Sequence, residues 1–235
     1  MLKLAAIAVL AVGSLNPLAV PAGACEVSGM TVSWGFKESF RSYISGSIAQ
    51  GQWVVEGDIG YETPAFSFSD GQGFVSPDRS AGEVGFTGSL AFEGHGGILE
   101  TTLANPRVEF VDPRSATLFL DVTGDTMEEV SVSEDNVAFA SVSWGASDVD
   151  QVAGIWGVDN ATVVLTEAGS KAFGTYPAGE ELDPLDFILQ ASPGCLQEKL
   201  SPWGVAGGVA GIAAISSLAA LAIVRVRKSR EQGRQ

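Results

Sequence analysis

The sequence predicts a mainly β domain, an antiparallel sandwich or barrel-like sheet with two short helices, followed by a transmembrane helix near the C-terminus. Three observations predict this fold class. Apolar runs of strand length recur between glycine-rich turns, and in several of them every second residue is apolar. Only two segments show helical spacing. Residues 200–224 carry no charged side chain, which is typical of a membrane span.

The chain begins with a segment that is typical of a secretory signal peptide. Residues 1–24 contain Lys3, an apolar run, and alanines at 22 and 24, the small-residue spacing that favours cleavage after Ala24. Cleavage there leaves Cys25 as the first residue of the mature protein. A lipoprotein signal, in which Cys25 is acylated, is the alternative.

Most of residues 27–190 are predicted to form strands of one antiparallel domain. In 83–93 the apolar residues alternate with small or polar ones, which is the period of a half-buried strand. The remaining predicted strands cover 53–57, 65–68, 98–103, 107–111, 117–123, 136–142, 161–166 and 186–190. We find no internal repeat, so residues 25–195 are expected to be a single domain.

Two segments depart from the strand pattern. In 34–46 one helical face collects four apolar residues, Phe36, Phe40, Tyr43 and Ile44. Gly46 is placed to end this helix. A second short helix is predicted over 166–176, with Thr166 as its N-cap.

The only two cysteines lie at the two ends of the predicted domain. Cys25 and Cys195 would be exported to a compartment that permits disulfides, where a bridge between them would join the ends. Closing a loop of about 170 residues stabilises a fold by roughly 5 kcal/mol in the chain-entropy description.

The charges are distributed unevenly along the chain. Residues 25–200 hold 27 acidic and 7 basic side chains, whereas the tail 225–235 holds 5 basic and 1 acidic. An acidic domain repels phosphate backbones, so nucleic-acid binding is not expected. The basic tail marks the cytoplasmic side of a span over 203–224, so the domain is expected outside the membrane.

A short linker joins the domain to this predicted span. Residues 196–202 reach at most about 25 Å when fully extended, which keeps the domain close to the membrane. Within 203–224 two overlapping GxxxG pairs would let two helices approach closely, so a homodimer is one expectation. Frequent small residues in such helices are the plainer interpretation.

Few residues suggest chemistry. The single histidine, His95, excludes sites that need two histidines, and no GxSxG, P-loop or dinucleotide motif occurs. Tyr43 on the first helix and His95 in the turn 93–97 remain. A tyrosine phenolate is an established axial ligand of haem iron, and a histidine N–H can hydrogen bond to it. Lys37 and Arg41 could reach haem propionates or simply be solvated.

Three segments, in this order, resemble the conserved haem-binding domain of the HtaA/HtaB family: 34–46 (WGFKESFRSYISG), 82–110, which contains GHGG, and 165–187. The resemblance implies a mainly β domain that binds ferric haem b through Tyr43, supported by His95. A serine also contributes to the family's site. Ser42 and Ser45 are candidates, but Ser39 is favoured because it lies one turn before Tyr43.

The resemblance further implies a non-enzymatic role in haem uptake. The chain is similar to single-domain, membrane-anchored members, which take haem from donor proteins and pass it to a haem-binding lipoprotein of an ABC importer. Two other classes remain open. An adhesin or carbohydrate-binding β module would need exposed tryptophans, for which Trp53, Trp144 and Trp156 are available. A ligand sensor would need a partner, because its tail is short.

Overall fold

The computed structural model describes residues 20–125, 131–146, 149–152 and 154–196. Within them lie two helices, α1 (Glu38–Ser45) and α2 (Glu167–Phe173). The strands are β1 (Cys25–Trp34), β2 (Gln52–Gly57), β3 (Ile59–Glu62), β4 (Ala65–Phe68), β5 (Gln72–Val75), β6 (Gly82–Gly85), β7 (Gly88–Gly94), β8 (Leu99–Asp112), β9 (Ser115–Asp125), β10 (Ser131–Ser143), β11 (Val149–Val152), β12 (Ile155–Leu165) and β13 (Leu185–Ala191). The predicted mainly β class with two short helices is confirmed.

All these strands belong to one antiparallel sheet that closes on itself. β13 pairs with both β1 and β12, and the ring continues through β10, β9, β8, β6 and β5 back to β1. In several strands every second residue faces inward, as Leu118, Leu120 and Val122 do in β9, and these residues pack into one apolar core. The sheet is therefore the rigid frame of the domain.

The sheet forks at two long strands. The first residues of β1 pair with β5 and its last residues pair with β4, while β8 pairs first with β7 and then with β6. The prediction of one strand over 83–93 was wrong, because β6 and β7 are separate. The break falls at Phe86 and Thr87, beside a bulge of β8 where Asn105 is left-handed with φ 48°. The two runs predicted at 98–103 and 107–111 form a single strand, β8.

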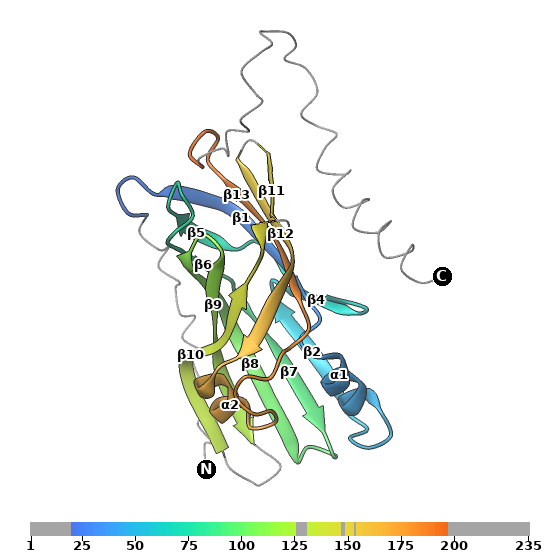
Figure 1. The fold of residues 1–235 in the computed structure, drawn as a ribbon. Coiled ribbons are helices and arrows are strands. Elements are labelled where there is room, and N and C mark those ends of the chain that lie inside the picture. Colours follow the sequence, from blue (N-terminus) through green and yellow to red (C-terminus); the bar gives the residue numbers. More distant parts are fainter. Residues whose placement is uncertain (1–19, 126–130, 147–148, 153, 197–235) are drawn as a thin grey trace, which may run out of the picture. The chain divides into compact units, whose positions relative to one another are not determined.

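The two helices lie at one end of the sheet (Figure 1). Their apolar faces meet in an aromatic cluster, in which the ring of Phe40 on α1 lies 5.0 Å from Phe92 of β7 and 5.1 Å from Phe173 of α2. The prediction for α2 is confirmed at its N-terminus, since Thr166 accepts a hydrogen bond from the backbone of Gly169. The prediction that Phe36 lies on a helix was wrong, because α1 begins only at Glu38.

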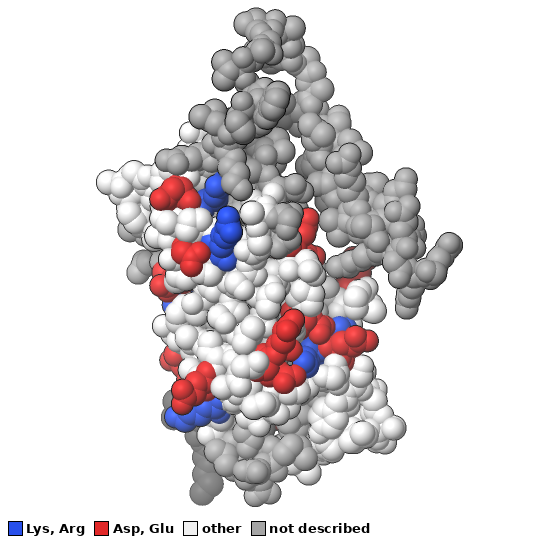
Figure 2. Space-filling model, viewed as in Figure 1, with Lys and Arg blue, Asp and Glu red and all other residues white. Residues whose placement is uncertain are grey.

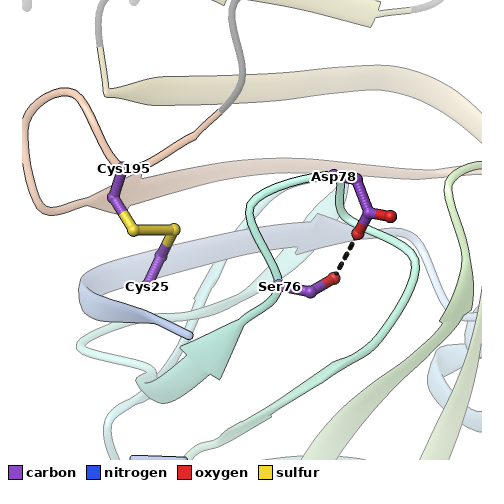
Figure 3. The surroundings of a disulfide bond; sticks show 4 residues. All are labelled: Cys25, Ser76, Asp78 and Cys195. Carbon is purple, nitrogen blue, oxygen red and sulfur yellow. Dashed lines mark hydrogen bonds between the residues drawn. A yellow bond between two sulfur atoms is a disulfide. The ribbon is translucent and has the colours of Figure 1, made fainter. Parts of the chain in front are cut away.

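A disulfide joins the two ends of the described domain. Cys25 and Cys195 are bonded, with their Cα atoms 5.6 Å apart, which confirms the predicted pairing (Figure 3). The nearby turn is organised by Asp78, whose carboxylate accepts hydrogen bonds from the hydroxyls of Ser80 and Ser76 and thereby lowers the pKa of Asp78 to about 2. The disulfide lies at the opposite end of β1 from α1, because Cys25 is the first residue of β1 and α1 follows its last residue.

Several predicted segments lie outside the described residues. These are most of the signal peptide, nearly all of the linker, the span 203–224 and the tail 225–235. Among the described residues no helix is long and apolar enough to cross a membrane.

Candidate functional site

Tyr43 lies on the last full turn of α1, at the edge of the aromatic cluster. The helix buries Phe40 and Ile44 completely, and these two residues fix its rotation about its axis. Tyr43 packs its ring 6.3 Å from that of Phe40 and remains half-buried. The Tyr43 ring therefore packs against the core on one side and is partly exposed to solvent.

His95 comes from the turn between β7 and β8. Its backbone is left-handed with φ 53°, and Gly96 and Gly97 also have positive φ, which this tight turn requires. The backbone N–H of His95 donates to the carbonyl of Ala49 at 2.7 Å, and Ala49 is buried in the loop after α1. The turn that carries His95 is thus fastened to the loop that follows Tyr43.

The structure brings Tyr43 and His95 together. The hydroxyl oxygen Oη of Tyr43 lies 2.5 Å from Nε2 of His95, and both side chains are half-buried. A phenol can donate its proton to an unprotonated Nε2, and a phenolate can accept a hydrogen bond from a protonated Nε2. The pair can therefore lose the phenol proton and still keep its hydrogen bond.

A second polar pair lies one helical turn from Tyr43. The hydroxyls of Ser39 and Tyr176 are 3.1 Å apart, and Tyr176 follows α2. Of the other candidate serines, Ser45 turns back to donate to the carbonyl of Arg41, and Ser42 is exposed. Ser39 is exposed as well, and its role in the site stays a prediction. Tyr176 was missed from the sequence, although it ends the segment predicted as the second helix.

The two basic residues of α1 are paired with acidic residues. Nζ of Lys37 lies 2.5 Å from Glu180 and also donates to the carbonyl of Glu181, while Arg41 pairs with Asp183 at 3.1 Å. Figure 2 shows the same arrangement over the visible face, where basic side chains lie next to acidic ones and neutral surface separates the groups. Neither base is a free partner for an anionic ligand.

Two exposed apolar side chains lie in the segments that follow Tyr43 and His95 in the chain. Ile48 is 71% exposed in the loop after α1, and Ile98 is 54% exposed in the turn that holds His95. The Ala49–His95 hydrogen bond joins these two turns. A separate small cavity in the sheet core is lined by apolar residues and contains neither Tyr43 nor His95.

The three candidate tryptophans in the described part of the chain do not form a sugar-binding platform. Trp144 is 6% exposed and Trp156 is fully buried, and their rings pack against one another and against Phe187. Trp53 is half-buried and packs against Tyr61. The exposed aromatic surface that a carbohydrate-binding module would need is not supplied by these three residues.

Comparison with protein families gives a match that spans most of the domain. The model of the HtaA family, described as Htaa, matches residues 29–188. Comparison with curated proteins gave no match.

Solved structures of HtaA domains and of HtaB resemble the domain. The C-terminal domain of HtaA from Corynebacterium glutamicum is 32% identical, with a TM-score of 0.65 over 72% of this chain and 99% of that one. The N-terminal domain of the same protein is 31% identical, with a TM-score of 0.59 over 71% and 98%. The heme binding protein HtaB from the same organism is 20% identical, covers 72% and 95% with a TM-score of 0.52, and supports the fold alone.

Proposed function

Because the chain belongs to the HtaA family, we propose that it is a haem-binding protein of the cell envelope in which Tyr43 is the ligand of ferric iron. The observation that carries the proposal is the distance of 2.5 Å between Oη of Tyr43 and Nε2 of His95. A structural relative, HtaB, is itself described as a heme binding protein.

The pair fits the chemistry of ferric haem. A phenol ionises near pH 10 in water, so a neutral-pH phenolate ligand needs both a cation and a hydrogen-bond donor beside it. Bound haem iron would supply the positive charge. Nε2 of His95 would accept the phenol proton and then donate a hydrogen bond to the phenolate, which would also fix the direction of the Tyr43 side chain.

The surroundings offer contacts for the rest of a porphyrin. Ile48 and Ile98 present exposed apolar surface in the segments that follow Tyr43 and His95, and Ser39, one helical turn before Tyr43, brings its hydroxyl to that of Tyr176. Binding and release of haem require no covalent change in the porphyrin. We therefore propose a carrier and not an enzyme.

The place of the site in the domain suits a relay. α1 follows the last residue of β1, whereas the chain leaves the described domain beside Cys195, which is bonded to the first residue of β1. Ten residues of strand span about 33 Å. The proposed haem site and the Cys25–Cys195 disulfide therefore lie at opposite ends of β1. Donor proteins, and a haem-binding lipoprotein of an ABC importer, would engage the end that carries the haem site.

A titration with ferric haem tests the proposal. The purified protein should bind one haem per chain and shift its Soret band, and iron-free protoporphyrin should bind much more weakly because it cannot use Tyr43. A protein that gives no Soret change, or that is retained on glycan columns instead, would contradict haem binding. Equal affinity for haem and protoporphyrin would contradict coordination by the protein.

A further inference from the structure

We infer that Asp183 is a positioning residue for the site: its carboxylate holds the start of α1 and so keeps Tyr43 against His95. The inference rests on the proposed function for its consequence in haem binding. The effect of Asp183 on the position of α1 concerns the protein without haem and can be tested separately.

The chain enters α1 in a conformation that needs outside support. Phe36 is fully buried yet left-handed, with φ 62°, a conformation that is strained for a bulky residue. Lys37 stands at the N-cap but its side chain makes no capping hydrogen bond. An eight-residue helix is marginal by itself, so α1 depends on contacts from elsewhere in the chain.

Asp183 supplies those contacts from 145 residues away. One carboxylate oxygen accepts a hydrogen bond from the backbone N–H of Glu38 at 3.0 Å, which is the role of an N-cap side chain. The other oxygen pairs with Arg41 at 3.1 Å. The backbone of Asp183 adds two bonds, donating to the carbonyl of Phe36 and accepting from Nε1 of Trp34, each at 2.9 Å.

The close fit at Gly35 supports the same conclusion. A Cβ atom placed there would lie 2.4 Å from a carboxylate oxygen of Asp183, closer than any real contact allows. The carboxylate therefore occupies the space beside the backbone that leads into α1. Only glycine at position 35 permits this approach without a shift.

The loop that carries Asp183 is itself fixed to the sheet. Leu165 at the end of β12 donates to the carbonyl of Glu180, and Leu182 donates to the carbonyl of Val163, each at 2.9 Å. The Lys37–Glu180 ion pair adds a third connection between this loop and α1. Asp183 thus fixes α1, the helix that bears Tyr43, relative to β12.

Removing the Asp183 carboxylate should displace Tyr43 for two reasons. The first turn of α1 loses its cap, and Arg41, whose side chain is only 11% exposed, loses its counter-charge. Tyr43 lies on the opposite end of the helix from Asp183, so a change in helix tilt moves its hydroxyl relative to His95. We expect an increase of about tenfold in the haem dissociation rate.

The test compares Asp183→Ala and Asp183→Asn with a matched control, Asp121→Ala. Asp121 also accepts one backbone and one side-chain hydrogen bond, from Asn136 and Asn105, but lies on β9. Each alanine variant removes one negative charge, so general electrostatic effects are matched. Asp183→Asn retains an oxygen that can cap Glu38 and loses only the ion pair, so it should lie between the wild type and Asp183→Ala.

Two measurements on the haem-free protein come first. Hydrogen exchange should show faster exchange of the α1 amides in Asp183→Ala, with the sheet still protected. The ring NMR signals of His95, which are unambiguous because the chain has one histidine, should move toward those of free histidine. Haem dissociation into an excess of a haem-scavenging globin is then measured for each variant.

The outcomes separate this inference from the proposed function. A folded Asp183→Ala protein with wild-type α1 exchange and wild-type His95 signals would overturn the positioning role. So would equal effects in Asp121→Ala. If those haem-free measurements change as expected while the wild-type protein binds no haem, Asp183 positions the helix and it is the haem function that fails.

Discussion

Oη of Tyr43 and Nε2 of His95 meet at 2.5 Å although 52 residues separate them in the sequence. Two contacts bring them together. Phe40 and Ile44 fix the rotation of α1 in the core, and the Ala49 carbonyl fastens the His95 turn to the loop that follows the helix. The pair thus forms where α1 lies beside the turn between β7 and β8. Because each partner comes from a different element, each can be substituted separately.

Replacing His95 should weaken haem binding without abolishing it. His95→Ala leaves the phenolate without its hydrogen-bond partner, and loss of such an outer partner typically costs about 10- to 100-fold in affinity. His95→Asn is the better-matched variant, because asparagine tolerates the left-handed backbone at this position. Haem titrations of both variants should show this loss with a shifted Soret band. Wild-type affinity in both would argue against the role of His95.

Removing either hydroxyl of the Ser39–Tyr176 pair should have a small and similar effect. Ser39→Ala and Tyr176→Phe each break the same hydrogen bond, worth roughly threefold to tenfold in haem affinity if it orders the binding surface. The double variant should be no weaker than the single ones, because the bond is already lost. Strictly additive losses would show that the two hydroxyls act independently.

Making the exposed Ile48 and Ile98 polar should speed haem loss. Ile48→Ser combined with Ile98→Ser removes exposed apolar area from the segments that follow Tyr43 and His95, and we expect about a tenfold faster dissociation of haem. Val111→Ser is the control, since Val111 is 52% exposed on β8 and is not part of the site. Equal dissociation rates in all three proteins would place the porphyrin elsewhere on the surface.

Haem affinity should depend only weakly on salt. Lys37 and Arg41 already pair with Glu180 and Asp183, and the domain carries an excess of acidic residues, so propionates gain little long-range attraction. The dissociation constant for haem should change by about twofold or less between low and high sodium chloride. A steep loss of affinity with salt would mean that one of these bases leaves its acidic partner to bind a propionate.

Local patterns predicted much of the fold. The alternation of apolar residues predicted the strands, Thr166 predicted the start of α2, and the two cysteines predicted the disulfide. These features depend on residues that are close in sequence or have only one available partner. The forked pairing of β8 could not be predicted, because a continuous apolar alternation over 83–93 does not reveal where the chain changes from β6 to β7.

The candidate site was predicted less completely. Tyr43 and His95 were paired on chemical grounds and through the family resemblance, since each residue alone is ordinary in its local setting. Asp183 and Tyr176 were missed because their partners on α1 lie more than 130 residues away. The roles of Lys37 and Arg41 depended on the same long-range contacts, and the structure pairs both with acidic residues.

The most direct test of the central claim is the spectrum of ferric haem bound to tyrosine variants. The chain has three tyrosines, so Tyr43→Phe can be compared with Tyr61→Phe, a matched change in a ring that packs against Trp53 and Phe66. Resonance Raman spectra of the wild type and Tyr61→Phe should show the iron–phenolate stretch, and Tyr43→Phe should lose it together with the native Soret band. Retention of that stretch in Tyr43→Phe would contradict the assignment of Tyr43 as the iron ligand.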